Sequence, residues 1–175
     1  MHDEIYEGFL KRQYEEGMAL AAQSDLLHLI PLEEPPVRRY IAEFYCKGLA
    51  SSAGGEVFED DRFAVWIGFP LDYLRRVDPF EVIRWVGPPD VFHPNISAKA
   101  PLICLGRITP GTTLVELLYR CFDVITYNKV TMREDDALNH EACVWARQNF
   151  DRFPIDKRPL KRRTLDFCVE AAEQS

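Results

Sequence analysis

No stretch of this sequence is apolar enough to cross a membrane. Hydrophobic residues make up 47% of its 175 residues and charged residues 28%, which is the balance of a soluble globular protein. No apolar run approaches the ~20 residues that a spanning helix needs. The acidic start, Met1 to Glu4, is followed by no apolar signal segment. We therefore expect a cytoplasmic protein of one domain, residues 1–175, because this length suits a single domain.

The sequence also lacks paired cysteines. Five cysteines occur, and no two of them are close in sequence: Cys46, Cys104, Cys121, Cys143 and Cys168. The odd number and the wide spacing argue against a disulfide framework and against a zinc site. Most of them are expected to be buried thiols, as for Cys121 on an apolar helix stripe. Cys104 differs, because it lies in an irregular stretch.

Positive charge and glycine-rich loops are both scarce. No glycine-rich loop could cradle a phosphate, so no cofactor is expected. The formal net charge is −7, which disfavours nucleic acid as a partner because phosphate contacts dominate that affinity. Five basic residues nevertheless gather within residues 157–163. We interpret this basic cluster as a solvated helix face, with docking of an acidic partner or nucleic acid as the alternative.

Hydrophobic periodicity predicts one helix, four strands and then three helices. The expected helices span residues 3–24, 112–125, 135–150 and 160–173, and the expected strands span residues 26–30, 38–46, 63–69 and 80–86. Residues 51–55 are expected to form a flexible loop and residues 59–61 a turn. Strands that are segregated from helices and joined by short connections indicate an α+β fold with a four-stranded antiparallel meander.

A long irregular stretch, residues 87–111, separates the strands from the later helices. Loops of this length in a compact domain are usually functional or disordered. Its apolar members, such as Phe92, Ile103 and Leu105, predict that the stretch is packed. We therefore expect the functional residues here.

Several motifs in order resemble those of the ubiquitin-conjugating enzymes, in particular their prokaryotic branch. Phe69-Pro70-Leu71-Asp72-Tyr73 is similar to the family's FPxDYP segment. Phe92-His93-Pro94-Asn95-Ile96, followed by Ile103-Cys104-Leu105, is similar to its HPNI…ICL signature. Thr109-Pro110 and Asp135-Asp136-Ala137-Leu138-Asn139 resemble the segments before its later helices. The resemblance covers most of the chain and implies the ubiquitin-conjugating-enzyme-like fold.

This resemblance also implies an activity and its partners. Such an enzyme accepts a ubiquitin-like protein from an activating enzyme as a cysteine thioester and transfers it to an amine. A target protein or a ligase is a further possible partner. No cofactor is implied, since the activating enzyme consumes the ATP.

The family's nucleophile matches Cys104, and its asparagine matches Asn95. A thioester carrier needs an accessible thiol that can become a thiolate. An amide donor can stabilise the oxyanion that forms when an amine attacks, and this is the role that the family implies for Asn95. The alternative for Asn95 is a structural side chain that bonds its own loop.

Two further positions carry expected roles. His93 is expected to tie down backbone with a ring nitrogen rather than to act as a general base. Asp136, and secondarily Asp135, match the family's acidic site, which promotes deprotonation of the attacking amine. The alternative for both aspartates is capping of the helix that follows.

The sequence departs from the family at one position beside the nucleophile. Gly106 stands where the family commonly has Asp. Two other functions are compatible with the residues: a non-catalytic scaffold of the same fold that binds a modifier or partner, and a hydrolase in which His93 or His140 activates Cys104.

Overall fold

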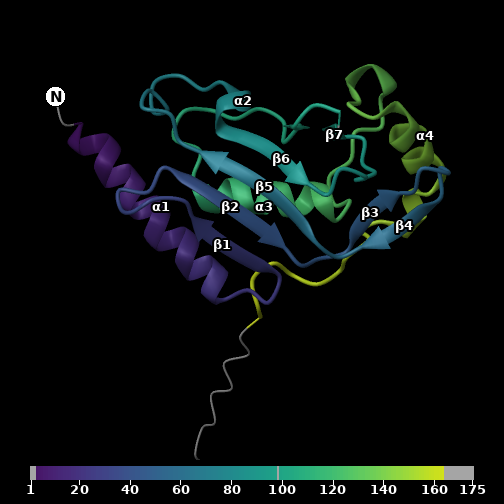
Figure 1. Cartoon of the computed structure of the whole chain (residues 1–175), viewed down its shortest axis with the longest axis horizontal. Coiled ribbons are helices and arrows are strands. Elements are labelled where there is room, and N and C mark those ends of the chain that lie inside the picture. The colour runs from purple at the N-terminus through teal and green to yellow at the C-terminus, as the bar shows by residue number, and fades with distance from the viewer. Residues whose placement is uncertain (1–2, 98, 164–175) are drawn as a thin grey trace, which may run out of the picture.

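The computed structural model of the chain describes residues 3–97 and 99–163 (Figure 1). It confirms the α+β class, with an N-terminal helix, a four-stranded antiparallel sheet and helices after the sheet. Within the described ranges, no helix is both long and apolar enough to cross a membrane.

The four-stranded sheet has the order β1-β2-β5-β6, and every neighbouring pair is antiparallel. Its strands are β1 (Leu27–Pro31), β2 (Arg39–Phe44), β5 (Phe63–Gly68) and β6 (Ile83–Gly87). Cross-strand partners form a buried row of Leu29, Ala42, Val65 and Trp85. Because successive side chains point to opposite faces, this row marks the one face of the sheet that carries the core.

Two helices belong to the same core as this face. They are α1 (Glu4–Ala22) and α3 (Leu114–Ile125), and α3 runs behind the sheet in Figure 1. Thr113 caps α3 by accepting the Glu116 N–H at 3.2 Å. The buried Gln13 accepts the Leu114 N–H at 2.8 Å and so links α1 to the first turn of α3. The sheet and α3 together fix the position of the loop between them.

The connections within the sheet differ from expectation. The predicted loop, residues 51–55, is largely the connection of a hairpin whose strands were not predicted, β3 (Gly48–Ser51) and β4 (Val57–Asp60), and β4 takes in part of the predicted turn 59–61. The expected fourth strand starts later, because α2 (Pro79–Val82) precedes β6. Asp78 caps α2 by accepting the Phe80 N–H at 2.9 Å, with Pro at the first helical position. This capping chemistry favours a helical turn over strand alternation.

The later helices are shorter than predicted. The expected helix 135–150 is a 3-10 turn, η1 (Glu134–Asp136), followed by α4 (His140–Gln148) and a second such turn, η2 (Phe150–Arg152). Leu138, which lies within the expected helix, precedes α4 and is 37% exposed. The first four residues of the expected helix 160–173 are not helical, and its remainder lies outside the described residues.

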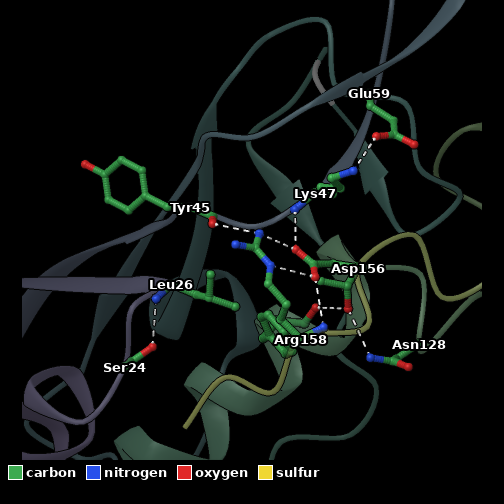
Figure 2. A network of polar contacts seen from close by, with 10 residues as sticks. Ser24, Leu26, Tyr45, Lys47, Glu59, Asn128, Asp156 and Arg158 are labelled. Carbon is green, nitrogen blue, oxygen red and sulfur yellow. Dashed lines mark hydrogen bonds and ion pairs between the residues drawn. The ribbon is translucent and has the colours of Figure 1, made fainter. Parts of the chain in front are cut away.

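Residues 153–163 run along the lower side of the molecule in Figure 1, and a buried carboxylate holds them in place (Figure 2). Asp156 is 3% exposed and accepts the Lys47 N–H at 2.8 Å. The Arg158 guanidinium donates to the same carboxylate at 2.7 and 3.1 Å and also contacts the Tyr45 carbonyl. The segment is therefore tied to the chain between β2 and β3.

The basic cluster lies on this segment, so its interpretation as a helix face is wrong. Pro159 interrupts the cluster, and residues 157–163 are not helical. Arg158 is paired with Asp156, while Arg162 lies 3.6 Å from Asp25 and donates to the Ala22 carbonyl at 2.7 Å. Two of the five cations therefore hold the segment against the body of the protein.

Candidate active site

Cys104 lies in an extended stretch between two buried residues. Ile103 is 7% and Leu105 2% exposed, whereas the Cys104 side chain between them is exposed. The Cys104 N–H donates to the Asn95 carbonyl at 2.8 Å. This bond continues the short pairing of β7 (Ile96–Ser97) with β8 (Leu102–Ile103). The prediction that the irregular stretch is packed is confirmed, and the thiol points out of it.

The other described cysteines are unlike Cys104. Cys46, Cys121 and Cys143 are fully buried, and burial raises the thiol pKa of all three, that of Cys46 to about 12. The expectation for Cys121 is confirmed. Because the thiolate is the nucleophilic form, Cys104 is the one described cysteine suited to reaction. Cys168 lies outside the described residues.

Asn95 is buried, and its side chain is fully bonded. The side-chain oxygen accepts the Thr131 N–H at 2.8 Å, and Nδ2 donates to Thr131 Oγ1 at 2.9 Å and to the Cys104 carbonyl at 3.3 Å. Both amide hydrogens are thus in use. This geometry fits the structural alternative, in which Asn95 joins the cysteine loop to Thr131; an oxyanion donor would first have to release one bond.

His93 supports backbone, as the sequence suggested. It is 1% exposed, and its Nδ1 accepts the Asn95 N–H at 2.9 Å. Its ring lies edge-on to the Tyr127 ring, with centroids 4.2 Å apart. Burial lowers the pKa of His93 to about 3, so the ring is neutral near pH 7 and is a weak base. This weakens the hydrolase interpretation that relies on His93.

The two aspartates are exposed and do not cap α4, so the capping alternative is wrong for both. Asn139 caps α4 instead by accepting the Ala142 N–H at 3.0 Å. Asp135 and Asp136 both pair with Arg133, at 3.0 and 3.4 Å. Capping falls to Asn139 because the two aspartates belong to a separate 3-10 turn, η1, that ends before α4 begins.

The residues that follow the aspartates nevertheless contact the loop of residues 93–95. The Leu138 N–H donates to the Pro94 carbonyl at 2.8 Å, and the Asn139 N–H lies 3.3 Å from the same oxygen. Asp136 therefore lies two residues before Leu138, which contacts Pro94, the residue next to Asn95. His140 is the exposed first residue of α4.

The residues that clamp this loop carry no motif or periodicity that could have revealed them. They lie in residues 127–131, here called the clamp segment. Tyr127, with φ of 62°, donates its hydroxyl to the Phe92 carbonyl. Lys129 Nζ donates to the Leu105 carbonyl at 2.9 Å, and Thr131 bonds Asn95. The left-handed Tyr127 at the end of α3 turns the chain toward the loop.

The backbone conformation explains the glycine after Leu105. Gly106 has φ of +81°, a conformation that favours glycine. A Cβ at this position would lie 2.9 Å from Lys129 Nζ, the far end of a flexible side chain. The Asp that the family commonly has here would therefore meet a strained backbone.

An open groove of about 460 Å³ lies beside the same loop. The start of α4, β7 and residues 89–91 line it. Its polar side chains include Asp90, Lys99, His140 and Glu141, above apolar groups that include Ile96. The groove lies next to the β7–β8 hairpin that leads to Cys104.

Among residues 3–97 and 99–163, no group of three or more His, Cys, Asp or Glu side chains could hold a metal ion. No protein-family model matches the chain, and no curated protein matches it either.

Proposed function

We propose that this protein has the ubiquitin-conjugating-enzyme-like fold and carries a ubiquitin-like protein as a thioester on Cys104. The observation that carries the proposal is the exposed Cys104 thiol on a loop that Asn95 holds through both its backbone and its side chain. The other described cysteines are buried. A rigid loop with one outward thiol suits repeated acyl transfer, because positioning lowers the entropic part of the barrier.

The reaction has two steps. The Cys104 thiolate attacks the thioester carbonyl held by an activating enzyme, and the activating enzyme's cysteine leaves as a thiolate. A neutral amine of a target then attacks the new carbonyl, the C–S bond breaks, and the proton lost by the amine returns Cys104 to a thiol. Asn95 positions the loop, and the exposed carboxylate of Asp136 is the candidate relay that takes this proton from the nitrogen and passes it on to the leaving sulfur.

A non-catalytic scaffold is the second candidate function. A scaffold has no need for an exposed thiol, nor for a loop held on both sides of that thiol. The paired bonds of Asn95 to Cys104 and Thr131 therefore favour the carrier.

The test is the intact mass of the protein after incubation with an activating enzyme, its ubiquitin-like protein and ATP. We expect an adduct that thiol reductant removes, that Cys104→Ala abolishes and that becomes reductant-resistant in Cys104→Ser. Cys46→Ala, which removes a buried thiol, serves as the matched control and should load like wild type. No adduct from partners that do load a second conjugating enzyme would favour the scaffold.

A further inference from the structure

Lys129 places an amine against the backbone of the loop that carries the candidate nucleophile. Its Nζ donates to the carbonyl of Leu105 at 2.9 Å, and Leu105 directly follows Cys104. Consecutive Cα atoms are about 3.8 Å apart, so this bond to the next residue's carbonyl keeps the ammonium within roughly 9 Å of the Cys104 Cα. The missing side chain of Gly106 leaves room for the ammonium against the loop backbone.

The other lysines are placed differently. The chain has six, and the remaining five are Lys11, Lys47, Lys99, Lys157 and Lys161. Lys11 and Lys47 pair with Glu15 and Glu59. Lys157 and Lys161 lie on the C-terminal segment, and Lys99 lies in the turn of the β7–β8 hairpin. Lys129 is the one lysine whose Nζ bonds the loop that carries Cys104.

We propose that Lys129 is an intramolecular acceptor, to which an acyl group carried on Cys104 passes as an amide. The inference rests on the proposed thioester. The neutral amine attacks the thioester carbonyl, a C–N bond forms, and the C–S bond breaks. The sulfur leaves as a thiolate and takes up the proton that the nitrogen loses. Release of Lys129 from Leu105 breaks a single, partly buried hydrogen bond, which is a small cost beside an acyl-transfer barrier.

Self-transfer would be the default discharge when no target amine is bound. A reacting group held within one molecule has a high effective concentration, so it competes well with dilute amines. The product keeps the carried group through an amide, which thiols do not cleave. It also removes the Lys129 cation and its bond to Leu105. Lys129 is thus a modification site. When Cys104 is loaded in the absence of a target amine, the acyl group ends on Lys129 as a permanent amide beside the loop.

The test uses a small probe in place of the unidentified modifier. The full chain is mixed with the acetylglycyl thioester of 2-mercaptoethanesulfonate, and adducts are followed by intact mass and peptide mapping. Hydroxylamine separates thioesters, which it cleaves, from amides, which it leaves intact. We expect a labile adduct on Cys104 that gives way to a stable adduct on Lys129.

Three variants make the result specific. Lys129→Arg keeps the cation and its hydrogen bond but should reduce the stable adduct about tenfold or more, as loss of an intramolecular reaction predicts. Lys99→Arg, the control in the neighbouring turn, should leave the Lys129 adduct unchanged. Cys104→Ala should abolish it, because direct acylation by the dilute probe lacks the intramolecular advantage.

The outcomes separate this inference from the proposed function. A persistent thioester on Cys104 without a stable adduct would overturn the role of Lys129 and leave the carrier intact. Equal acylation of Lys129 in Cys104→Ala, or a stable adduct spread over all exposed lysines, would also overturn it. Absence of any adduct on Cys104 would contradict the accessible thiol and with it both proposals.

Discussion

His93 is neutral in the folded protein because its ring is buried, which lowers its pKa to about 3. A histidine in the unfolded chain has a pKa of about 6.5. The unfolded state therefore takes up a proton that the folded state does not bind, and stability falls as the pH drops from about 6.5 toward 3. The loss approaches about 1.4 kcal/mol per pH unit within this window.

The replacement His93→Asn isolates this effect. The Asn side-chain oxygen can accept the Asn95 N–H as Nδ1 does, but Asn does not titrate. We expect the free energy of unfolding of the variant to depend less steeply on pH between about 4 and 6, by up to one proton. Urea unfolding at several pH values measures this. Parallel pH curves for variant and wild type would contradict the burial of a neutral His93.

Sequence motifs predict residues near each other in the chain better than distant partners. Asn95 and Cys104 are nine residues apart, and the motif predicted that both belong to one site. Thr131 is 36 residues from Asn95 and Lys129 is 24 from Leu105. Neither shows periodicity or a motif, because its role depends on where α3 ends in space.

The two glycines within α1 have opposite surroundings. A Cβ on Gly8 would have no neighbouring atom within 4 Å, whereas a Cβ on Gly17 would lie 2.6 Å from Leu114 and 3.1 Å from Leu29. Both leucines are buried in the core. At Gly17, α1 therefore packs closely against both α3 and the sheet.

This contrast predicts opposite effects of the same substitution. Gly8→Ala should stabilise the protein by about 0.5–1 kcal/mol, because alanine loses less backbone entropy in a helix. Gly17→Ala should destabilise it by about 1–3 kcal/mol through overpacking. Chemical denaturation of the pair measures both, and the Gly8 variant controls for helix propensity. A stabilised Gly17→Ala would show that α1 can move away from α3.

The main strands and helices could be predicted because each has a clear buried face, as in α3 with Leu117, Leu118 and Cys121. The elements whose predicted type or bounds differ from the structure depend on local capping and turn chemistry, which the alternation of apolar and polar residues does not reveal. Asp135 and Asp136 resemble helix caps, but Asn139 supplies the cap. The β3–β4 hairpin is exposed along much of β4, so it lacks the buried pattern that reveals a strand.

The C-terminal segment joins distant parts of the molecule through Asp156. Burial raises the pKa of this carboxyl, but the bonds from Arg158 and the Lys47 N–H lower it more, from 3.8 to about 2. The pKa is lower in the folded state than in the unfolded state. Ionised Asp156 therefore stabilises the fold above about pH 4, and this stability is lost as the pH falls through about 2.

We expect Asp156→Asn to reduce the free energy of unfolding at pH 7 by about 2 kcal/mol, since each pKa unit is worth about 1.4 kcal/mol. Thermal or urea unfolding at pH 7 and near pH 2.5 measures this, and the difference from wild type should shrink at the lower pH. Asp25→Asn, which alters the exposed partner of Arg162, is the control and should change stability little. Equal stability of Asp156→Asn and wild type at pH 7 would rule out this contribution.

The β3–β4 hairpin has a consequence for the order in which the molecule can fold. The central pairing of the sheet joins Phe44 to Phe63, and the hairpin occupies most of the chain between them. Closing a free loop of that length costs entropy that grows with its length. A hairpin that forms locally shortens the loop that must close between Phe44 and Phe63. The effective contact order of the β2–β5 pairing is then lower than the separation of the two strands in sequence implies.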